Sequence, residues 1–344
     1  MRKPATLDPP GFFRRIPLLP HQLHDAITPT RDFFGVAHLG IPRIDAESWT
    51  LDIAGLVERP FSLTLAALRT LPKREVQSIH ECAGYPRNPA LATRRIANVV
   101  WGGVDLRDLL CKAGVQPNAT HLWSHGLDHG AYDGTETDAY VKDMPLSRLA
   151  EGGVLVAYEV NRETLPREHG FPARLVVPGY YGTNAVKWLW RLEVADRRAP
   201  GPFTTVFYND PLPATDADPS SGTQPVWEVA PESVIVAPAP AQTVVGSSAD
   251  IWGWAWAASG VREVVVSADA GRTWNAAELE SRRDWSWQRF RLTVRHLASG
   301  PTTLLSRATD NNGVSQPDAG ARNSVHAVEV RVRPAPRPAT CDRH

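Results

Sequence analysis

Short alternating or continuous apolar runs make up much of the first part of the chain. The run at 48–57 ("SWTLDIAGLV") begins with the two-residue period that is typical of strands, and the short apolar runs at 154–160 ("VLVAYEV") and 173–179 ("ARLVVPG") also indicate strands. Between them, "TLAALRTL" at 64–71 has the apolar spacing of a short helix. Strand and helix patterns in alternation predict a mixed α/β domain over residues 46–208.

The pattern changes in the last third of the chain, where alternating runs follow one another at short intervals. "DIWGWAWAAS" at 250–259 places three tryptophans on one face of a strand, and runs at 285–294 and 302–310 repeat the alternation. Short strands at this spacing predict an immunoglobulin-like β-sandwich over 226–333. The fold class is therefore α+β, a mixed α/β domain followed by a sandwich.

Three proline-rich segments flank these two domains. Residues 1–45 predict an extended arm that wraps over a surface without forming a core of its own. Residues 209–225 lack an apolar period and predict a linker, and 334–344 predict a disordered tail.

Composition restricts the class of protein. The 344 residues include 37 basic and 37 acidic side chains, and 42% are hydrophobic, as in a globular enzyme. No basic run is interleaved with aromatic residues, so nucleic acid is not an expected partner, and no membrane segment is expected. Arg14 and Arg15 are followed by a stretch too short and proline-broken for a signal peptide, which predicts a cytoplasmic protein; a periplasmic location is the alternative.

The three cysteines are scattered and do not indicate a disulfide framework or a paired metal site. Cys111 lies in "VDLRDLLCKAG", where the leucine spacing and Gly114 predict a helix, and we expect it to be a small apolar core residue. Cys341 lies in the tail, as an exposed thiol. Cys82, in "SIHECAGYPR", is expected where a strand gives way to a turn, and it is the candidate for chemistry.

Histidines suggest one alternative chemistry. His121, His125 and His129 recur at four-residue spacing and would share one face of a helix as zinc ligands. Gly126 and Gly130 interrupt such a helix and favour a strand that ends in a turn.

Cys82 also allows a second alternative, in which it is a nucleophile. His80 or a distant histidine would be its base, and Arg87 would stabilise the thiolate. His80 and Cys82 lie on the same face of a strand, but no protease signature accompanies them.

A third interpretation rests on a family resemblance. "ECAGYPR" resembles the "CAGNxR" motif of the sulfite oxidase family of molybdenum enzymes, whose cysteine binds the metal of a molybdopterin cofactor. Further similar segments run in the family's order through its cofactor domain and its dimerisation domain: "FFGVAHLGIP", "WTLDIAGLVERPFSLTLAALRTLP", "VLVAYEVNRETLPREHGFPARLVVPGYYGTNAVKWLWRLEV", "VVVSADAGRTWNAAEL" and "RATDNNGVSQP".

The resemblance implies a set of site residues. One soft thiolate suits a molybdenum ion whose other ligands come from its cofactor, so Cys82 is implied as the metal ligand. The residues implied to bind the cofactor are His38, Asp128, His169, Arg174, Lys187 and the backbone of Ala185 and Val186. Without the surrounding motif, Lys187 and Arg174 would read as ordinary surface cations.

Tyr208, just before the linker, is implied as the catalytic residue, because the family carries a tyrosine near the metal's oxo ligand. A phenol there can hydrogen-bond the oxo group or a substrate. The alternative is a tyrosine that anchors the domain junction.

The implied reaction is two-electron oxygen-atom transfer with one molybdenum per chain. No CxxCH motif occurs, so we expect no haem and a separate electron carrier, such as a c-type cytochrome. The other interpretation is a cofactor-free interaction protein.

The chain departs from the family where sulfite is bound. Members that oxidise sulfite carry arginines at the positions of Val36 and Asn184, and the segment that adds another arginine is shortened, leaving only Arg322. Tyr85 also replaces the motif's asparagine. We therefore expect a small-molecule substrate that is a sulfur compound less charged than sulfite, or an S-oxide; sulfite itself is the alternative.

Tryptophan content suggests a homodimer. Seven tryptophans from Trp227 to Trp287 are too many for the interior of one sandwich, so some are expected to line a subunit interface.

Overall fold

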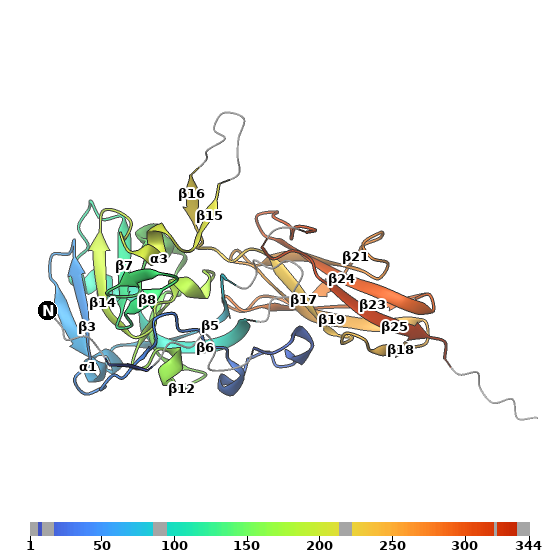
Figure 1. Cartoon of the computed structure of the whole chain (residues 1–344), viewed down its shortest axis with the longest axis horizontal. Coiled ribbons are helices and arrows are strands. Elements are labelled where there is room, and N and C mark those ends of the chain that lie inside the picture. The colour runs from blue at the N-terminus through green and yellow to red at the C-terminus, as the bar shows by residue number, and fades with distance from the viewer. Residues whose placement is uncertain (1–5, 9–16, 85–94, 213–221, 320–321, 336–344) are drawn as a thin grey trace, which may run out of the picture.

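The computed structural model describes residues 6–8, 17–84, 95–212, 222–319 and 322–335. The chain forms two bodies side by side, with the first domain at the left of Figure 1 and the sandwich at the right. Tyr85, Arg87 and Cys341 lie outside the described residues, as does most of the expected tail.

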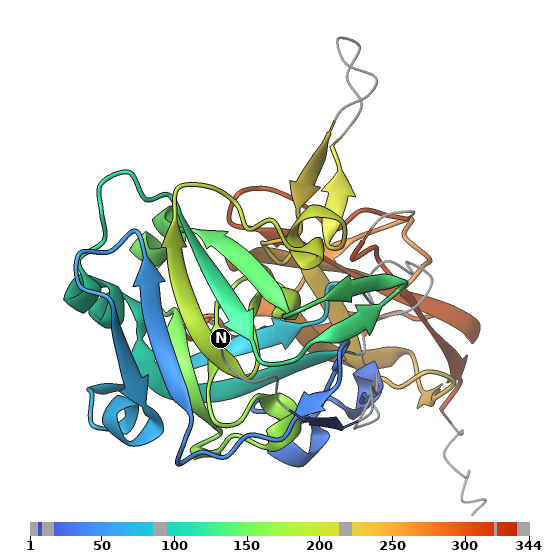
Figure 2. The same cartoon turned by 60° about the vertical axis from the view of Figure 1, so that its left-hand side comes forward.

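The first sheet of the first domain has the strand order β10-β7-β14-β3-β4. In Figure 2, blue β3 (Thr50–Gly55) lies beside yellow-green β14 (Leu189–Ala195), and these two strands pair in parallel. The other pairs are antiparallel. The remaining strands are β4 (Phe61–Thr64), β7 (His121–Gly126) and β10 (Val141–Pro145).

The second sheet has the order β12-β11-β6-β5, and β13 also pairs with β11. Its longest antiparallel pair joins β5 (Lys73–Glu81) to β6 (Ile96–Asp105). Cys82 follows directly on β5. The other strands are β11 (Leu155–Val160), β12 (Glu163–Thr164) and β13 (Arg174–Val176).

The α-helices are short and are capped as their sequences suggest. Helix α1 (Leu65–Arg69) follows Thr64, whose hydroxyl accepts a hydrogen bond from the Ala67 N–H. Helix α2 (Leu106–Ala113) follows Asp105 and ends at Gly114, whose φ of 71° is in the left-handed region. Cys111 is exposed on α2, so its prediction as a core residue was wrong. Helix α3 (Pro202–Thr205) precedes the expected linker.

Smaller elements connect these parts. The 3-10 helices are η1 (Pro20–Gln22), η2 (Thr30–Asp32), η4 (Leu146–Glu151), η5 (Arg167–His169) and η6 (Gly182–Asn184). The short strands outside both large sheets are β1 (Leu7–Asp8), β2 (Ile41–Pro42), β8 (Gly130–Tyr132) and β9 (Thr135–Thr137).

The main core lies between the two sheets and includes the apolar face of α2. The opposite face of the second sheet is covered by the arm, because Phe33 and Phe34 pack there against Trp101 of β6 and are buried. The arm therefore completes the core of the first domain and, as described below, one wall of the candidate site.

The second domain is a sandwich of two sheets with the orders β17-β19-β23-β22 and β18-β25-β24-β20-β21. The first sheet contains β17 (Glu232–Ala237), β19 (Ser248–Trp256), β22 (Glu278–Leu279) and β23 (Gln288–Arg295). The second contains β18 (Thr243–Val245), β20 (Val261–Ser267), β21 (Asn275–Ala276), β24 (Gly300–Asp310) and β25 (Ala327–Arg333).

Tryptophans of the sandwich pack against the first domain of the same chain. Trp254, Trp256 and Trp287 are buried in one apolar cluster with Leu23 of the arm and Ile79 of β5. The Trp254 indole donates to the Leu23 carbonyl at 2.7 Å. The intrachain junction thus accounts for these rings, so their number is not an argument for a subunit interface.

The expected linker contains a β-hairpin, because β15 (Asn209–Pro211) pairs with β16 (Thr223–Pro225). The hairpin projects from the body in both views (Figures 1 and 2). Among the described residues, no helix is long and apolar enough to span a membrane.

Candidate functional site

A cavity lies in the first domain, where the arm meets the end of β5 and the segment from η5 to Trp188. Eight of the nine predicted site residues line it: His38, Cys82, Asp128, His169, Arg174, Ala185, Lys187 and Tyr208. The ninth, Val186, is buried in the main core, and its carbonyl accepts a hydrogen bond from the Leu175 N–H. Sequence positions up to 170 residues apart therefore meet at one site.

A main-chain hydrogen bond fixes Cys82 at the end of β5. Its N–H donates to the carbonyl of Arg95 at 3.0 Å, across the ends of β5 and β6. The Arg95 guanidinium in turn lies 3.7 Å from the Cys82 sulfur, as a hydrogen-bond donor. Sequence reasoning missed Arg95, because nothing in "ATRRIAN" shows that it faces a cysteine thirteen residues earlier.

Arg174 organises the inner wall of the cavity. Its guanidinium donates to the carbonyls of His169, at 3.1 Å, and Ala185, at 2.8 Å, and lies over the Trp101 ring. Among the described residues, its Nε has no hydrogen-bond partner and is buried. Burial lowers the pKa of Arg174 to about 9, and no carboxylate of the described residues offsets this effect.

His169 is fixed by stacking on Phe33 of the arm, with ring centroids 4.3 Å apart. Gly170, which follows it, has a φ of 106°, and a Cβ there would come within 3.1 Å of the side chains of Arg174 and Lys187. Glycine therefore permits the turn that brings these three polar side chains to one wall.

Lys187 and Asp128 provide a further cation and a carboxylate. The Lys187 ammonium donates to the carbonyls of Val36, at 2.6 Å, and Glu168, at 2.9 Å. Burial lowers the pKa of Lys187, and the charge of Arg174 lowers it further. Burial also raises the pKa of Asp128, whose Oδ1 has no hydrogen-bond partner in the structure. A ligand with both anionic and hydrogen-bond-donor groups would satisfy this wall.

Tyr208 faces the cavity and contacts His38, which is 170 positions away in sequence. The phenol oxygen and His38 Nε2 are 2.6 Å apart. Burial, together with the charges of Lys187 and Arg95, lowers the pKa of His38 to about 4. A neutral imidazole can accept the phenol proton, so we assign the donor role to Tyr208.

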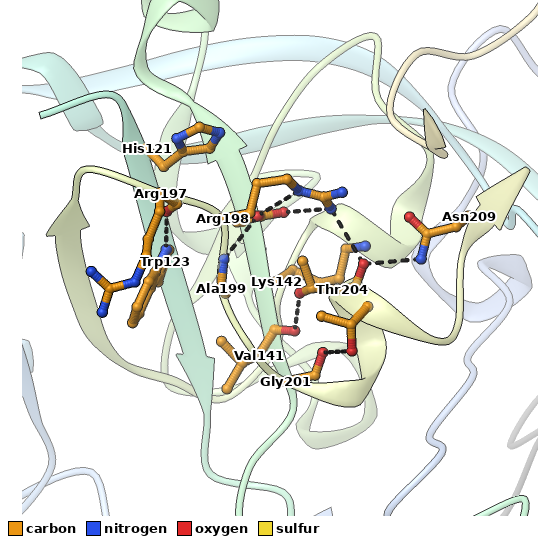
Figure 3. Close-up of polar contacts among 12 residues, drawn as sticks. His121, Trp123, Val141, Lys142, Arg197, Arg198, Ala199, Gly201, Thr204 and Asn209 are labelled. Carbon is orange, nitrogen blue, oxygen red and sulfur yellow. Dashed lines mark hydrogen bonds and ion pairs between the residues drawn. The ribbon is translucent and has the colours of Figure 1, made fainter. Parts of the chain in front are cut away.

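Polar contacts tie the segment around Tyr208 to β10, and Figure 3 shows one of them, in which the Thr204 hydroxyl donates to the Val141 carbonyl. Lys142 donates to the Phe203 carbonyl at 2.9 Å, and its ammonium lies 5.7 Å from the centre of the Tyr208 ring. Asp143 accepts from the Arg198 guanidinium at 3.0 and 3.2 Å. These contacts support a backbone that holds Tyr208 at a φ of 60°, a conformation that is uncommon outside glycine.

The three positions that concern anion binding differ in placement. Val36 lines the cavity. Asn184 is buried, and its amide donates to the carbonyls of Tyr181 and Val226, at 3.0 and 2.9 Å. Arg322 donates to the Ala83 carbonyl, next to Cys82, but the Asp210 carboxylate binds it at 2.6 and 2.8 Å.

The two alternative chemistries have different outcomes. His121 and His125 lie on strand β7, so the helical zinc site was wrong, and the described part of the chain holds no cluster of three His, Cys, Asp or Glu residues suited to a metal. His80 does line the cavity with Cys82, but its Nε2 is 3.4 Å from the Arg174 guanidinium. Burial and this guanidinium lower the pKa of His80 well below its usual value.

The wall of the cavity fits the cofactor that the family resemblance implies. The buried Arg174 Nε and Asp128 Oδ1 lack partners in the structure, and a phosphate-bearing pterin offers acceptors for the first and donors for the second. Cys82, which lines the same cavity, supplies a single soft ligand. We therefore treat the eight lining residues as the candidate cofactor and active site.

Comparisons with known proteins agree in both domains. A family model described as "Oxidoreductase molybdopterin binding domain" matches residues 38–203. A second, described as "Mo-co oxidoreductase dimerisation domain", matches residues 223–330 and supports a homodimer.

Individual relatives extend this similarity over most of the chain. Sulfite oxidase of Gallus gallus is 33% identical over 347 residues, which cover 93% of this chain and 72% of that protein. Mitochondrial sulfite oxidase of Macaca fascicularis is 34% identical, and the match covers 90% of this chain and 62% of that protein. This chain thus spans less than two thirds of the macaque relative.

A solved structure agrees with these matches. The sulfane dehydrogenase SoxCD from Paracoccus pantotrophus has a TM-score of 0.77 and is 28% identical, covering 90% of this chain and 82% of that one. The chain therefore belongs to the sulfite oxidase family of molybdopterin-dependent oxidoreductases.

Proposed function

We propose that this enzyme transfers an oxygen atom to or from a sulfur compound that carries less negative charge than sulfite. The observation that carries the proposal is Val36, an apolar side chain on the cavity wall at the position where the family resemblance implies an arginine in sulfite-oxidising members. Asn184 is turned into the protein, and Arg322 is already bound by Asp210. Each missing charge-assisted contact weakens the binding of an anion by about 1.5–3 kcal/mol.

The lining residues take the following roles in this proposal. Cys82 would bind molybdenum, and the cofactor would be held by the side chains of His38, Asp128, His169, Arg174 and Lys187 and by the backbone of Ala185, with Val186 behind that wall in the main core. When bound, the molybdenum cofactor supplies the two-electron redox change and the oxygen-atom transfer. Tyr208 has one hydroxyl proton, which it donates to His38 in the structure and would donate instead to the substrate oxygen when substrate binds.

In the oxidative direction, the sulfur atom gains one oxygen that derives from water. Two electrons and two protons are released for each oxygen gained. We propose that a separate one-electron carrier, such as a c-type cytochrome, removes the electrons. In the reductive direction, an S-oxide would lose its oxygen as water and the same carrier would deliver the electrons.

Relatives support two substrate classes. SoxCD is named a sulfane dehydrogenase, which supports a sulfur substrate other than sulfite. The second candidate is sulfite itself, because relatives at 33–34% identity are named sulfite oxidases and because Arg95 places a cation at Cys82.

The test is steady-state kinetics of molybdenum-loaded enzyme. Sulfite would be assayed with an artificial electron acceptor, and a panel of neutral sulfides and S-oxides with an oxidised or reduced dye, respectively. We expect at least one uncharged sulfur compound to have a higher kcat/KM than sulfite. Saturation by micromolar sulfite with many turnovers per second would favour the second candidate instead.

A further inference from the structure

Arg95 is the cation in direct contact with the sulfur of Cys82. The main-chain bond between the Cys82 N–H and the Arg95 carbonyl fixes the two residues opposite each other where β5 ends and β6 begins. From this position the guanidinium reaches to 3.7 Å from the sulfur. The contact is therefore set by the pairing of the two strands as well as by side-chain placement.

The charge of Arg95 extends into the cavity. Together with Lys187, it lowers the pKa of His38, which lines the cavity, after the larger effect of burial. Among the described residues, Arg322 also lies near the thiol, but it contacts the Ala83 carbonyl and is bound by Asp210. Arg95 is thus placed to act on Cys82 itself.

We infer that Arg95 is a positioning residue that sets the direction of the reaction. A hydrogen bond from a cation to a metal-bound thiolate withdraws negative charge from the sulfur, which stabilises the reduced metal and raises its reduction potential. A higher potential favours the transfer of two electrons from the substrate to the site. The inference rests on the proposed function and names its direction: this chain oxidises its sulfur substrate, with water as the oxygen source and the one-electron carrier as the oxidant.

The test compares metal-loaded wild type with Arg95→Gln and Arg95→Lys. Glutamine keeps a donor but removes the charge, whereas lysine keeps the charge with a different shape. Arg162→Gln is the matched control, because Arg162 is an exposed arginine of the same domain that pairs with Glu75. Metal content and thermal unfolding would establish that each variant is loaded and folded.

The readout is the midpoint potential, from a dye-mediated titration that follows the thiolate-to-metal absorption band. We expect Arg95→Gln to lower the potential so that the oxidised form gains at least tenfold at equilibrium, or about 30 mV for a two-electron couple. The ratio of sulfide oxidation to S-oxide reduction should fall in parallel. Arg95→Lys should recover part of both changes, and Arg162→Gln should match wild type.

An unchanged potential in loaded Arg95→Gln would overturn the inference, and so would a changed potential with an unchanged ratio of the two rates. If Arg95→Gln fails to hold metal, Arg95→Lys decides by the same two readouts. Preference for neutral over anionic substrates is a separate measurement, so failure of the proposed substrate class would be seen independently of these results.

Discussion

Introducing a cation at position 36 is expected to strengthen the binding of sulfite at this site. Val36 lines the cavity, and its main-chain carbonyl accepts a hydrogen bond from Lys187. A substitution at this position changes only the side chain and leaves that carbonyl in place. In Val36→Arg, the new guanidinium would make a charge-assisted contact with the anion, worth about 1.5–3 kcal/mol. Because about 1.4 kcal/mol corresponds to a factor of ten, the KM for sulfite should fall by roughly ten- to hundredfold.

The assay is the initial rate of sulfite oxidation with an artificial acceptor, over a range of sulfite and salt concentrations. Val36→Met is the matched control, because it adds length without charge. The advantage of Val36→Arg over Val36→Met should shrink as salt screens the new charge. Equal KM values for the two variants, each loaded with metal, would refute the reasoning that the missing arginine limits sulfite binding.

Three further predictions concern residues around the cavity. Lys142→Met removes the ammonium that binds the Phe203 carbonyl near the Tyr208 ring, so kcat should fall about tenfold while KM changes little. A fall in kcat that is explained entirely by a smaller fraction of folded enzyme would instead indicate a purely structural lysine. Asn184→Arg overfills a buried site and removes donors from two carbonyls, so it should lower the free energy of unfolding by roughly 2–4 kcal/mol in urea titrations; wild-type stability would contradict the observed burial. His38 has a folded pKa of about 4, below its usual 6.5, so wild type should lose up to about 3 kcal/mol of stability as the pH falls from 6.5 to 4. His38→Gln should remove this part of the pH dependence, and parallel curves for the two proteins would be the contrary result.

Local patterns predicted the elements of the fold well. The two-residue alternation at 48–57 corresponds to β3, and the leucine spacing after Asp105 corresponds to α2. The error at Cys111 arose because the helix was predicted without following its faces: leucines 106, 109 and 110 fill the buried side, and residue 111 points to the other side.

Contacts between distant residues could not be predicted from local patterns. His38 and Tyr208 meet only because the arm and the turn after α3 reach the same cavity. Composition also could not show whether the sandwich tryptophans cover a second subunit or the same chain, and Trp254 and Trp256 cover the same chain. The contact of Arg95 with Cys82 could not be predicted from local sequence, because it depends on the pairing of β5 with β6.

The central claim is that Cys82 binds molybdenum in this cavity. X-ray absorption at the molybdenum edge, on protein made in a molybdopterin-competent host, tests it most directly. We predict one molybdenum per chain and three sulfur neighbours, two from the cofactor and one from Cys82. Cys82→Ser should keep its fold and lose one of these sulfurs, because a hard hydroxyl replaces a soft thiolate poorly. The same number of sulfur neighbours in wild type and metal-loaded Cys82→Ser would contradict the account.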